Sequence, residues 1–321
     1  MAIGIEAPGG PEQLTTLNKP ARSADPGEIS VRIEAAGVNF VDTYHRIGLY
    51  PLDLPVVLGM EGAGTVDEVG DGVDGVEVGD RVAWSGALGS YADRITMSAD
   101  TVVPVPEDVS TEIAAALMLQ GLTAHYLVNS TYPVQEGDRV LIHAGAGGVG
   151  GLAIQLAVRA GAEVFTTVGT AEKEEIASSA GAHHVIRYDQ TDFAEEITKI
   201  AGPRPLAVVY DGVGATTFDG SISTLRPRGM MVTFGNASGP VEPVSPLVLS
   251  QNGSLFLTRP TLASYTATKE ELRYRADELF VLVGSGDLAV RIGRTFPLDE
   301  AADAHRALEG RQTTGKVLLL P

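Results

Sequence analysis

Three glycines in the middle of the chain have the spacing of a loop that can hold a diphosphate. Gly145, Gly147 and Gly150 stand in the pattern G-x-G-x-x-G, after an apolar stretch typical of a strand and before an amphipathic stretch typical of a helix. The first glycine permits a tight turn, the second lets the diphosphate approach the backbone, and the third lets helix and strand pack closely. Free N–H groups at the helix start, around Gly148 and Val149, would bind the phosphates. The motif predicts a dinucleotide-binding loop; a purely structural glycine-rich turn is the alternative.

The segment that follows the loop lacks an acidic residue that NAD-binding sites normally have. In those sites an Asp or Glu about 20 residues further on binds the ribose 2′-hydroxyl. Here the second strand is expected to end in Val168-Gly169-Thr170, so Gly169 leaves room for a 2′-phosphate, with Lys173 and Tyr188 nearby. The sequence therefore favours NADPH as cofactor. The alternative for Lys173 is a solvated helix lysine, because neighbouring glutamates make the region less basic.

The elements around this loop alternate regularly between strand and helix patterns. The expected strands cover residues 139–143, 163–168, 185–188, 206–210, 230–234 and 255–258, and the expected helices cover 149–160, 171–179, 193–201 and 217–225. Strands that alternate with helices of this length indicate a parallel sheet with helices on both faces. We expect a nucleotide-binding domain over residues 123–259.

The two ends of the chain have a different pattern. Short, glycine-punctuated strands are expected at 29–34, 62–69, 80–84, 91–97 and 101–105, with no helix of good length before residue 110 and a long helix at 112–129. After residue 259 we expect a helix to 283 opened by the capping box of Thr268, a helix capped by Asp299, and a strand at 315–320. Residues 1–122 and 260–321 are therefore expected to form one β-rich domain.

Composition excludes several classes of protein. The 321 residues include no cysteine, which removes disulfides, iron–sulfur clusters, thiolate nucleophiles and cysteine-bound zinc. The net charge of −18 makes nucleic acid an unfavourable partner, because binding depends on neutralising phosphates. No signal peptide or membrane-spanning stretch is expected, so a cytoplasmic location fits. The acidic composition indicates either adaptation to high salt or ordinary solubility.

Several stretches together resemble one family along essentially the whole chain. The sequence resembles the medium-chain dehydrogenase/reductases in A-G-V-N-F-V-D-T-Y-H-R-I-G-L-Y-P (36–51), G-M-E-G-A-G-T-V (59–66), G-D-R-V (79–82), A-G-A-G-G-V-G (144–150) and G-K-V-L-L (315–319). It resembles their quinone oxidoreductase (zeta-crystallin-like) branch in V-G-T-A-E-K, V-V-Y-D-G-V-G (208–214) and V-T-F-G-N-A-S-G (232–239). The resemblance implies an α/β fold: a GroES-like β-rich catalytic domain plus a Rossmann doubly wound parallel sheet, with NADPH in the cleft between them.

The same resemblance indicates a zinc-independent member. Zinc-dependent members carry a histidine ligand in G-H-E-x-x-G, where this chain has Met60, and the adjacent His183 and His184 would point apart on a strand. Alcohol oxidation needs a Lewis acid or a strong base. Reduction of a quinone or enone needs only hydride, positioning and a proton. We therefore expect NADPH-dependent reduction of a small-molecule quinone or related conjugated carbonyl. An enoyl-thioester or alkenal double-bond reductase is the alternative, and a non-enzymatic structural or RNA-binding crystallin-like protein is disfavoured.

The resemblance also suggests site residues. Asn39 and Asp42 are candidates to fix a carbonyl or amide, and Tyr44 and Tyr50 are candidate donors to a developing oxyanion; a structural role is equally open for Asp42. The further cofactor-contacting positions that it implies are Phe40, Tyr126, Gly212, Phe234, Gly235, Asn236, Arg259 and Arg311. Arg311 could equally be a solvated arginine at a helix end.

One expected strand also suggests an assembly. Leu255–Thr258 is short and apolar and would be the last strand of the sheet. An open edge of this kind invites antiparallel pairing around a two-fold axis, which predicts a homodimer. The alternative is an edge covered by the helix after Thr268.

Overall fold

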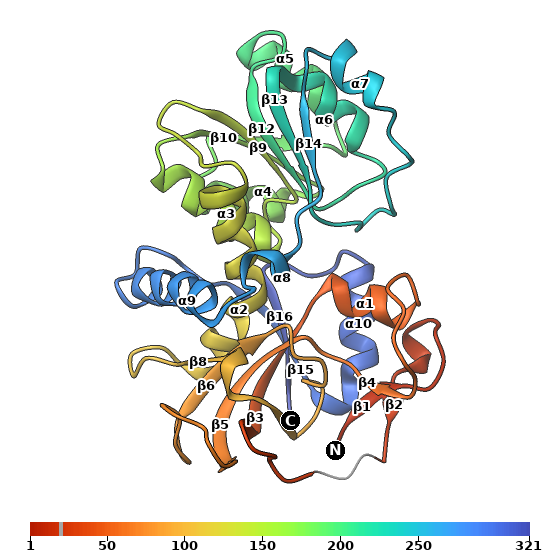
Figure 1. Cartoon of the computed structure of the whole chain (residues 1–321). Coiled ribbons are helices and arrows are strands. Elements are labelled where there is room, and N and C mark those ends of the chain that lie inside the picture. The colour runs from red at the N-terminus through yellow and green to blue at the C-terminus, as the bar shows by residue number, and fades with distance from the viewer. Residues whose placement is uncertain (19–21) are drawn as a thin grey trace. The chain divides into compact units, whose positions relative to one another are not determined.

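The computed structural model describes residues 1–18 and 22–321, which divide into two compact units (Figure 1). The first unit contains Met1–Leu122 and Tyr265–Pro321, and the second contains Thr123–Ser264. The second unit is thus inserted into the first, and helix α2 (Thr111–Tyr126) carries the chain from one to the other. Each unit has its own hydrophobic core.

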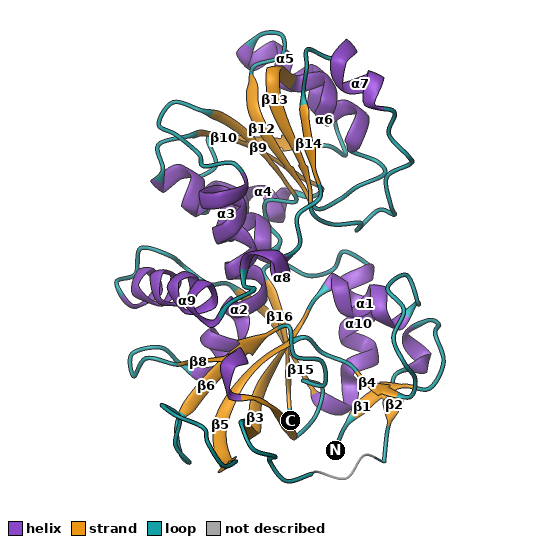
Figure 2. Ribbon diagram, in the orientation of Figure 1, coloured by secondary structure: helices purple, strands orange, loops and turns teal. Residues whose placement is uncertain are grey.

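The second unit is a parallel sheet with helices on both faces (Figure 2). Its strands lie in the order β11-β10-β9-β12-β13-β14, and every neighbouring pair is parallel. They are β9 (Arg139–His143), β10 (Glu163–Val168), β11 (His184–Arg187), β12 (Leu206–Asp211), β13 (Leu225–Thr233) and β14 (Phe256–Thr258). In chain order this is the 3-2-1-4-5-6 arrangement of a Rossmann sheet, whose order reverses between β9 and β12. The predicted α/β class with a doubly wound sheet is confirmed.

The helices of this unit pack in pairs. They are α3 (Gly148–Arg159), α4 (Ala171–Ser179), α5 (Phe193–Ala201), α6 (Phe218–Thr224) and α7 (Pro246–Gln251). Helix α3 contacts α4, and α5 contacts α6. Because parallel crossovers are right-handed, the two pairs cover opposite faces of the sheet. The central strands are therefore buried on both faces, which explains their continuous apolar runs.

The first unit is mainly antiparallel. Its larger sheet has the order β15-β16-β3-β5-β6-β8, with β7 pairing β3, and a small sheet has the order β2-β1-β4. The strands are β1 (Ile3–Ile5), β2 (Thr15–Thr16), β3 (Glu28–Val38), β4 (Val56–Val57), β5 (Glu61–Val69), β6 (Arg81–Ser85), β7 (Arg94–Ser98), β8 (Val102–Pro104), β15 (Ile292–Pro297) and β16 (Lys316–Leu320). Helices α1 (Phe40–Arg46), α9 (Lys269–Gly284) and α10 (Ala301–Glu309) belong to this unit, and α8 (Leu262–Tyr265) lies at its boundary.

The prediction of no sizeable helix before residue 110 overlooked α1. This helix has seven residues, several of them β-branched or aromatic, so intrinsic propensity did not indicate it. Asn39 begins it: the backbone N–H of Asn39 donates to the Asp42 carboxylate at 2.8 Å. That local bond satisfies a donor at the start of the helix and compensates for the weak propensity.

Two cap predictions had different outcomes. Thr268 is the N-cap of α9, as predicted, because its hydroxyl accepts a bond from the Glu271 N–H at 3.2 Å. Asp299 does not cap α10: it lies in a 3₁₀ turn, and the N-cap is Glu300, which makes no side-chain cap bond. The turn places Asp299 one residue too early.

The helix predicted at 112–129 ends three residues earlier than predicted, at Tyr126, where a π-helical turn (Leu127–Thr131) follows.

Candidate active site

The glycine loop of the second unit has the shape that its motif predicts. It follows β9, and Gly147 is the N-cap of α3 without a side-chain cap bond. A Cβ atom on Gly145 would overlap the Thr166 hydroxyl, and one on Gly150 would overlap the Ala144 carbonyl oxygen. A Cβ on Gly147 would come only within 3.1 Å of that oxygen. The outer two glycines therefore permit close packing, while the middle one leaves the backbone approachable, as a bound diphosphate requires.

The loops after β12 and β13 lie at the same edge of the sheet as the glycine loop. Asp211, at the end of β12, accepts bonds from the Val213 and Gly214 N–H groups at 2.7 and 3.0 Å and fixes the first of them. A Cβ on Gly235 would overlap the carbonyl oxygen of Gly212, so these loops touch. The structure thus brings the expected positions Gly212, Phe234, Gly235 and Asn236 to the carboxyl ends of adjacent strands. Ligands bind at this edge in open α/β sheets, where the strand order reverses.

Gly169 and Tyr188 lie side by side at the ends of β10 and β11. A Cβ on Gly169 would lie 2.5 Å from the Tyr188 hydroxyl, and the Tyr188 side chain is 46% exposed. Thr170 precedes α4 and is its N-cap: its hydroxyl accepts a bond from the Lys173 N–H at 3.2 Å. Arg187 is a further cation here, and no sequence motif indicates it. Its guanidinium is engaged by the Asp189 and Glu174 carboxylates at 2.7 and 3.5 Å.

The remaining predicted cofactor positions differ in their surroundings. Tyr126 is buried and lies at the end of α2, in the part of that helix that belongs to the second unit. Arg259 is exposed, and its guanidinium donates to the Thr233 carbonyl oxygen at 3.1 Å. Arg311 is exposed and has a left-handed backbone with φ of 56°. It belongs to the first unit, whereas the glycine loop belongs to the second.

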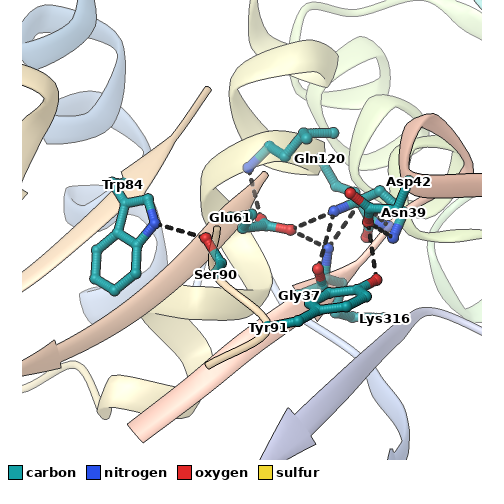
Figure 3. A network of polar contacts seen from close by, with 10 residues as sticks. Gly37, Asn39, Asp42, Glu61, Trp84, Ser90, Tyr91, Gln120 and Lys316 are labelled. Atoms are coloured by element: carbon teal, nitrogen blue, oxygen red, sulfur yellow. Dashed lines mark hydrogen bonds and ion pairs between the residues drawn. The ribbon is translucent and has the colours of Figure 1, made fainter. Parts of the chain in front are cut away.

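The second polar site lies in the first unit and is centred on Asn39 (Figure 3). The Asn39 side-chain oxygen accepts bonds from the Lys316 ammonium at 2.9 Å and from the Gln120 amide at 3.1 Å. Its side-chain nitrogen donates to Glu61 at 2.8 Å. These partners fix the orientation of the amide, because ammonium can only donate and carboxylate can only accept. Its acceptor capacity is fully used.

Glu61 and Lys316 form a buried ion pair beside Asn39. They come from β5 and β16, the two strands that flank β3 in the sheet. Between them β3 carries Gly37, where a Cβ would overlap the Glu61 carboxylate. The missing side chain therefore lets the pair meet across β3. Glu61 also accepts the Leu119 N–H at 2.6 Å, and burial lowers the pKa of Lys316.

Asp42 lies in the first turn of α1, three residues after Asn39, and has no exposed surface. One carboxylate oxygen accepts the Asn39 backbone N–H at 2.8 Å and the Tyr91 hydroxyl at 3.1 Å. The other oxygen is buried without a hydrogen-bond partner among the described residues. Burial raises the pKa of Asp42 to about 7, against the opposing effects of the Asn39 bond and the Lys316 charge.

The two tyrosines of the α1 region pack edge to face. The ring centroids of Tyr44 and Tyr50 are 5.4 Å apart, and those of Phe40 and Tyr44 are 6.3 Å apart. Tyr44 is buried, whereas Tyr50 is 36% exposed. Tyr50 is therefore the more accessible of the two tyrosines, and Tyr44 packs against its ring.

Among the residues the structure describes, no three His, Asp or Glu side chains are grouped so that they could hold a metal ion. His183 accepts a bond from the Val164 N–H at 3.1 Å, and its neighbour His184 contacts Glu163 at 2.8 Å.

Within the same described residues, no helix combines the length and apolar character needed to cross a membrane.

A Rossmann unit with a glycine loop at the reversal of its strand order, inserted into a β-rich unit, defines a dinucleotide-dependent oxidoreductase fold. The chain matches the family models described as "Alcohol dehydrogenase GroES-like domain" over residues 25–107 and "Zinc-binding dehydrogenase" over residues 148–280. The chain belongs to the medium-chain dehydrogenase/reductases, and within them to the zinc-independent quinone oxidoreductase branch. The family prediction is thereby confirmed.

Three relatives support this assignment along the whole chain. A quinone oxidoreductase of Pseudomonas aeruginosa is 45% identical, with 99% of both chains covered. A 2-haloacrylate reductase of Burkholderia is 43% identical, with 100% of this chain and 99% of the relative covered. The crystal structure of Escherichia coli quinone oxidoreductase with NADPH has a TM-score of 0.97 and 44% identity, covering 100% of this chain and 99% of that one.

Proposed function

We propose that this protein is an NADPH-dependent, zinc-independent quinone reductase that transfers hydride from NADPH to a quinone or a related conjugated carbonyl. The observation that carries the proposal is the glycine loop followed by Gly169, in a chain 44% identical to a quinone oxidoreductase crystallised with NADPH. Where an NAD site has a carboxylate for the 2′-hydroxyl, Gly169 has no charge to repel a 2′-phosphate.

The second unit holds the cofactor. The loop from Gly145 to Gly150 binds the diphosphate through backbone N–H groups at the start of α3. Lys173 and Tyr188 bind the 2′-phosphate beside Gly169, the lysine as a charge-assisted donor. When bound, NADPH supplies the hydride, and the quinone that accepts this hydride and one proton becomes a hydroquinone.

The first unit orients the substrate. The partly exposed Tyr50 donates a hydrogen bond to the substrate oxygen on which negative charge develops, and Tyr44 holds its ring in place. Asn39 and Asp42 fix the start of α1, from which both tyrosines follow. Since the acceptor capacity of Asn39 is already used, we assign it to positioning the turn.

A double-bond reductase is the second candidate, because the chain is 43% identical over its whole length to a 2-haloacrylate reductase. A panel of NADPH oxidation with 1,4-benzoquinone, 9,10-phenanthrenequinone, 2-chloroacrylate, an alkenal and crotonyl-CoA separates the two. We expect the quinones to be reduced fastest, before and after dialysis against EDTA. Turnover of only the alkenes would select the alternative, and zinc-restored turnover after dialysis would contradict a zinc-independent site. Tight NADPH binding with no turnover at all would favour the non-enzymatic role.

We also propose a homodimer formed through β14 and a cytoplasmic location. Strand β14 ends the sheet, and its Phe256 side chain is 57% exposed. Pairing two such strands would cover these apolar side chains and the free backbone groups of the edge. A cytoplasmic location matches the compartment that supplies NADPH, and cell fractionation with immunodetection tests it.

A further inference from the structure

A chain of hydrogen bonds that the proposed reaction does not use runs through the interior of the first unit to Asp42. At its outer end Arg46 pairs with Glu309 at 2.6 Å. Arg46 also contacts His305 Nδ1 at 2.9 Å, and His305 Nε2 contacts the Tyr91 hydroxyl at 3.0 Å. The Tyr91 hydroxyl donates to Asp42 at 3.1 Å. Arg46, His305, Tyr91 and Asp42 are all buried, and they come from α1, α10 and the segment before β7.

The chemistry of the groups allows only one direction along this chain. A guanidinium can only donate, so His305 Nδ1 must accept from Arg46. The imidazole is therefore neutral, with its proton on Nε2, and that N–H donates to the Tyr91 oxygen. The Tyr91 proton is then left for Asp42. Burial and the Arg46 charge lower the pKa of His305 to about 3, so the ring keeps this tautomer across the neutral range.

Asp42 joins this chain to the segment that carries the tyrosines. The same carboxylate oxygen that accepts the Tyr91 hydroxyl also accepts the Asn39 N–H at the start of α1. A carboxylate that accepts two bonds on one oxygen is held in one orientation, and it holds the first turn of α1 in return. The hydrogen bonds of His305 go to Arg46 and Tyr91, so its effect on the substrate-binding tyrosines is proposed to pass through Tyr91 and Asp42.

We propose that His305, oriented by Arg46, is a positioning residue of the reaction: it directs the Tyr91 hydroxyl onto Asp42 and so fixes the turn that presents Tyr44 and Tyr50. This inference rests on the proposed function, in which Tyr50 donates a hydrogen bond to the substrate and Tyr44 holds its ring in place.

The ionisation of Asp42 depends on the charges and hydrogen bonds around it, so it reports on the hydrogen-bond chain from Arg46 to Tyr91. Lys316 favours the ionised carboxylate, Glu61 opposes it, and Tyr91 favours it by donating a hydrogen bond. Arg46 and the neutral His305 act on it through Tyr91. An ionised carboxylate accepts stronger bonds than a neutral acid, so the turn is held more firmly above the pKa of Asp42. Activity should therefore fall toward acid pH as Asp42 takes up a proton.

Two substitutions at His305 distinguish the effect of its hydrogen bonds from the effect of its volume. His305→Gln keeps an acceptor for Arg46 and an N–H donor for Tyr91, whereas His305→Leu keeps neither. Ala307→Val is the matched control, because Ala307 is likewise buried on α10 but takes no part in the hydrogen bonds of the chain. We would measure kcat for quinone reduction at saturating NADPH from pH 5 to 9, and the melting temperature of each variant.

We expect His305→Leu to move the acid limb of the kcat profile upward by about half a unit to one unit, because the Tyr91 hydroxyl is no longer oriented by His305 and donates a weaker bond to the ionised Asp42. His305→Gln should leave the limb in place, and Ala307→Val should lower only the melting temperature. A limb moved equally by the glutamine and leucine variants, or by neither, would overturn the proposal. So would a limb abolished by His45→Gln, since this partly buried imidazole would then be the titrating group.

A second measurement does not depend on turnover. The difference in melting temperature between each His305 variant and the same variant carrying Asp42→Asn reports the ionisation of Asp42 as pH changes. The midpoint of that difference should rise in His305→Leu and stay at the wild-type value in His305→Gln. If the wild type reduces no quinone, the proposed function fails. The midpoint of the melting-temperature difference still tests the hydrogen-bond chain in that case. An unchanged midpoint in the leucine variant would show that His305 does not act on Asp42.

Discussion

Gly169 offers a test of cofactor choice at a single residue. Gly169→Asp would place a carboxylate where the 2′-phosphate is proposed to bind. Losing one charge-assisted contact costs about 1.5–3 kcal/mol, and about 1.4 kcal/mol is a factor of ten in affinity. We therefore expect the Kd of NADPH to rise at least tenfold while the Kd of NADH stays level or falls, measured by fluorescence titration.

Two variants control for the geometry at this position. Any Cβ at Gly169 must displace the Tyr188 hydroxyl, so Gly169→Ala isolates that steric effect. Lys173→Ala should weaken NADPH and leave NADH nearly unchanged, and Lys199→Ala, an exposed lysine on α5, should affect neither. Equal losses in the alanine and aspartate variants at Gly169 would remove charge as the explanation.

Asp42 and His305 have opposite effects on the pH dependence of stability. The pKa of Asp42 is about 7 in the folded protein against 3.8 for an ordinary aspartate, so raising the pH from about 4 to 7 destabilises the fold. The pKa of His305 is about 3 against 6.5, so raising the pH from about 3 to 6.5 stabilises the fold. Each group changes the free energy of unfolding by about 1.4 kcal/mol per pH unit. The two effects have opposite sign, so they nearly cancel in the pH range where both groups contribute.

In His305→Gln, the pH dependence of stability that comes from Asp42 should no longer be masked by that of His305. The variant loses the stabilisation that His305 gains with rising pH, which is about 3 kcal/mol between pH 4 and 6.5. Its melting temperature relative to wild type should therefore fall from pH 4 to 6.5 and stay constant above pH 7. Calorimetry at matched ionic strength measures this difference. A difference that is constant from pH 4 to 7 would mean that His305 is protonated in the folded protein.

At the scale of elements, β14 is where an assembly can be tested. Phe256→Lys places a charge in the proposed interface between two β14 strands, so the dimer should dissociate. Light scattering at micromolar concentration measures the mass. Leu247→Lys is the control, because Leu247 is 66% exposed but lies on α7, outside the strand. A monomeric wild type, or a Phe256→Lys dimer as stable as wild type, would contradict pairing through this edge.

Local patterns predicted the elements of the Rossmann unit well. The bounds of β9, β10, α4 and α5 coincide with the predicted ranges. The apolar runs of the two strands and the amphipathic pattern of α5 are properties of adjacent residues, so the sequence alone reveals them. The first unit was harder: β3 extends to Val38, four residues beyond its predicted end. Its glycine and alanine residues gave no apolar alternation there, and pairing with β5 and β16 forms the strand instead.

The polar site of the first unit was predictable only in part. Asn39 and Asp42 were found through resemblance, but their partners were not. Lys316 lies 277 positions from Asn39, and His305 lies 214 from Tyr91, so no spacing connects them. A signal that could have pointed to this site is Gly37, because a glycine inside a strand often marks the close approach of another group.

At the scale of the whole molecule, the net charge of −18 dominates the long-range electrostatics. Most ion pairs of the described residues involve at least one well-exposed side chain, such as Arg306 with Asp303 and Lys199 with Glu196. Exposed pairs of this kind contribute little to stability. The excess of carboxylates therefore remains largely uncompensated, and folding brings these charges closer together.

Salt should consequently stabilise the fold. At about 0.01 M the Debye length is near 30 Å, so carboxylates across the surface repel one another, whereas at about 1 M it is near 3 Å. Because repulsion opposes the compact state, screening should raise the melting temperature steadily from dilute buffer into molar KCl. Part of the rise could come from strengthened apolar burial, so sucrose, which is excluded from the surface without screening charge, serves as the control. A larger rise in KCl than in equimolar sucrose is the expected result. A melting temperature that stays flat from about 0.05 M to 2 M KCl would mean that carboxylate repulsion does not limit stability, since the Debye length shortens several-fold over that range.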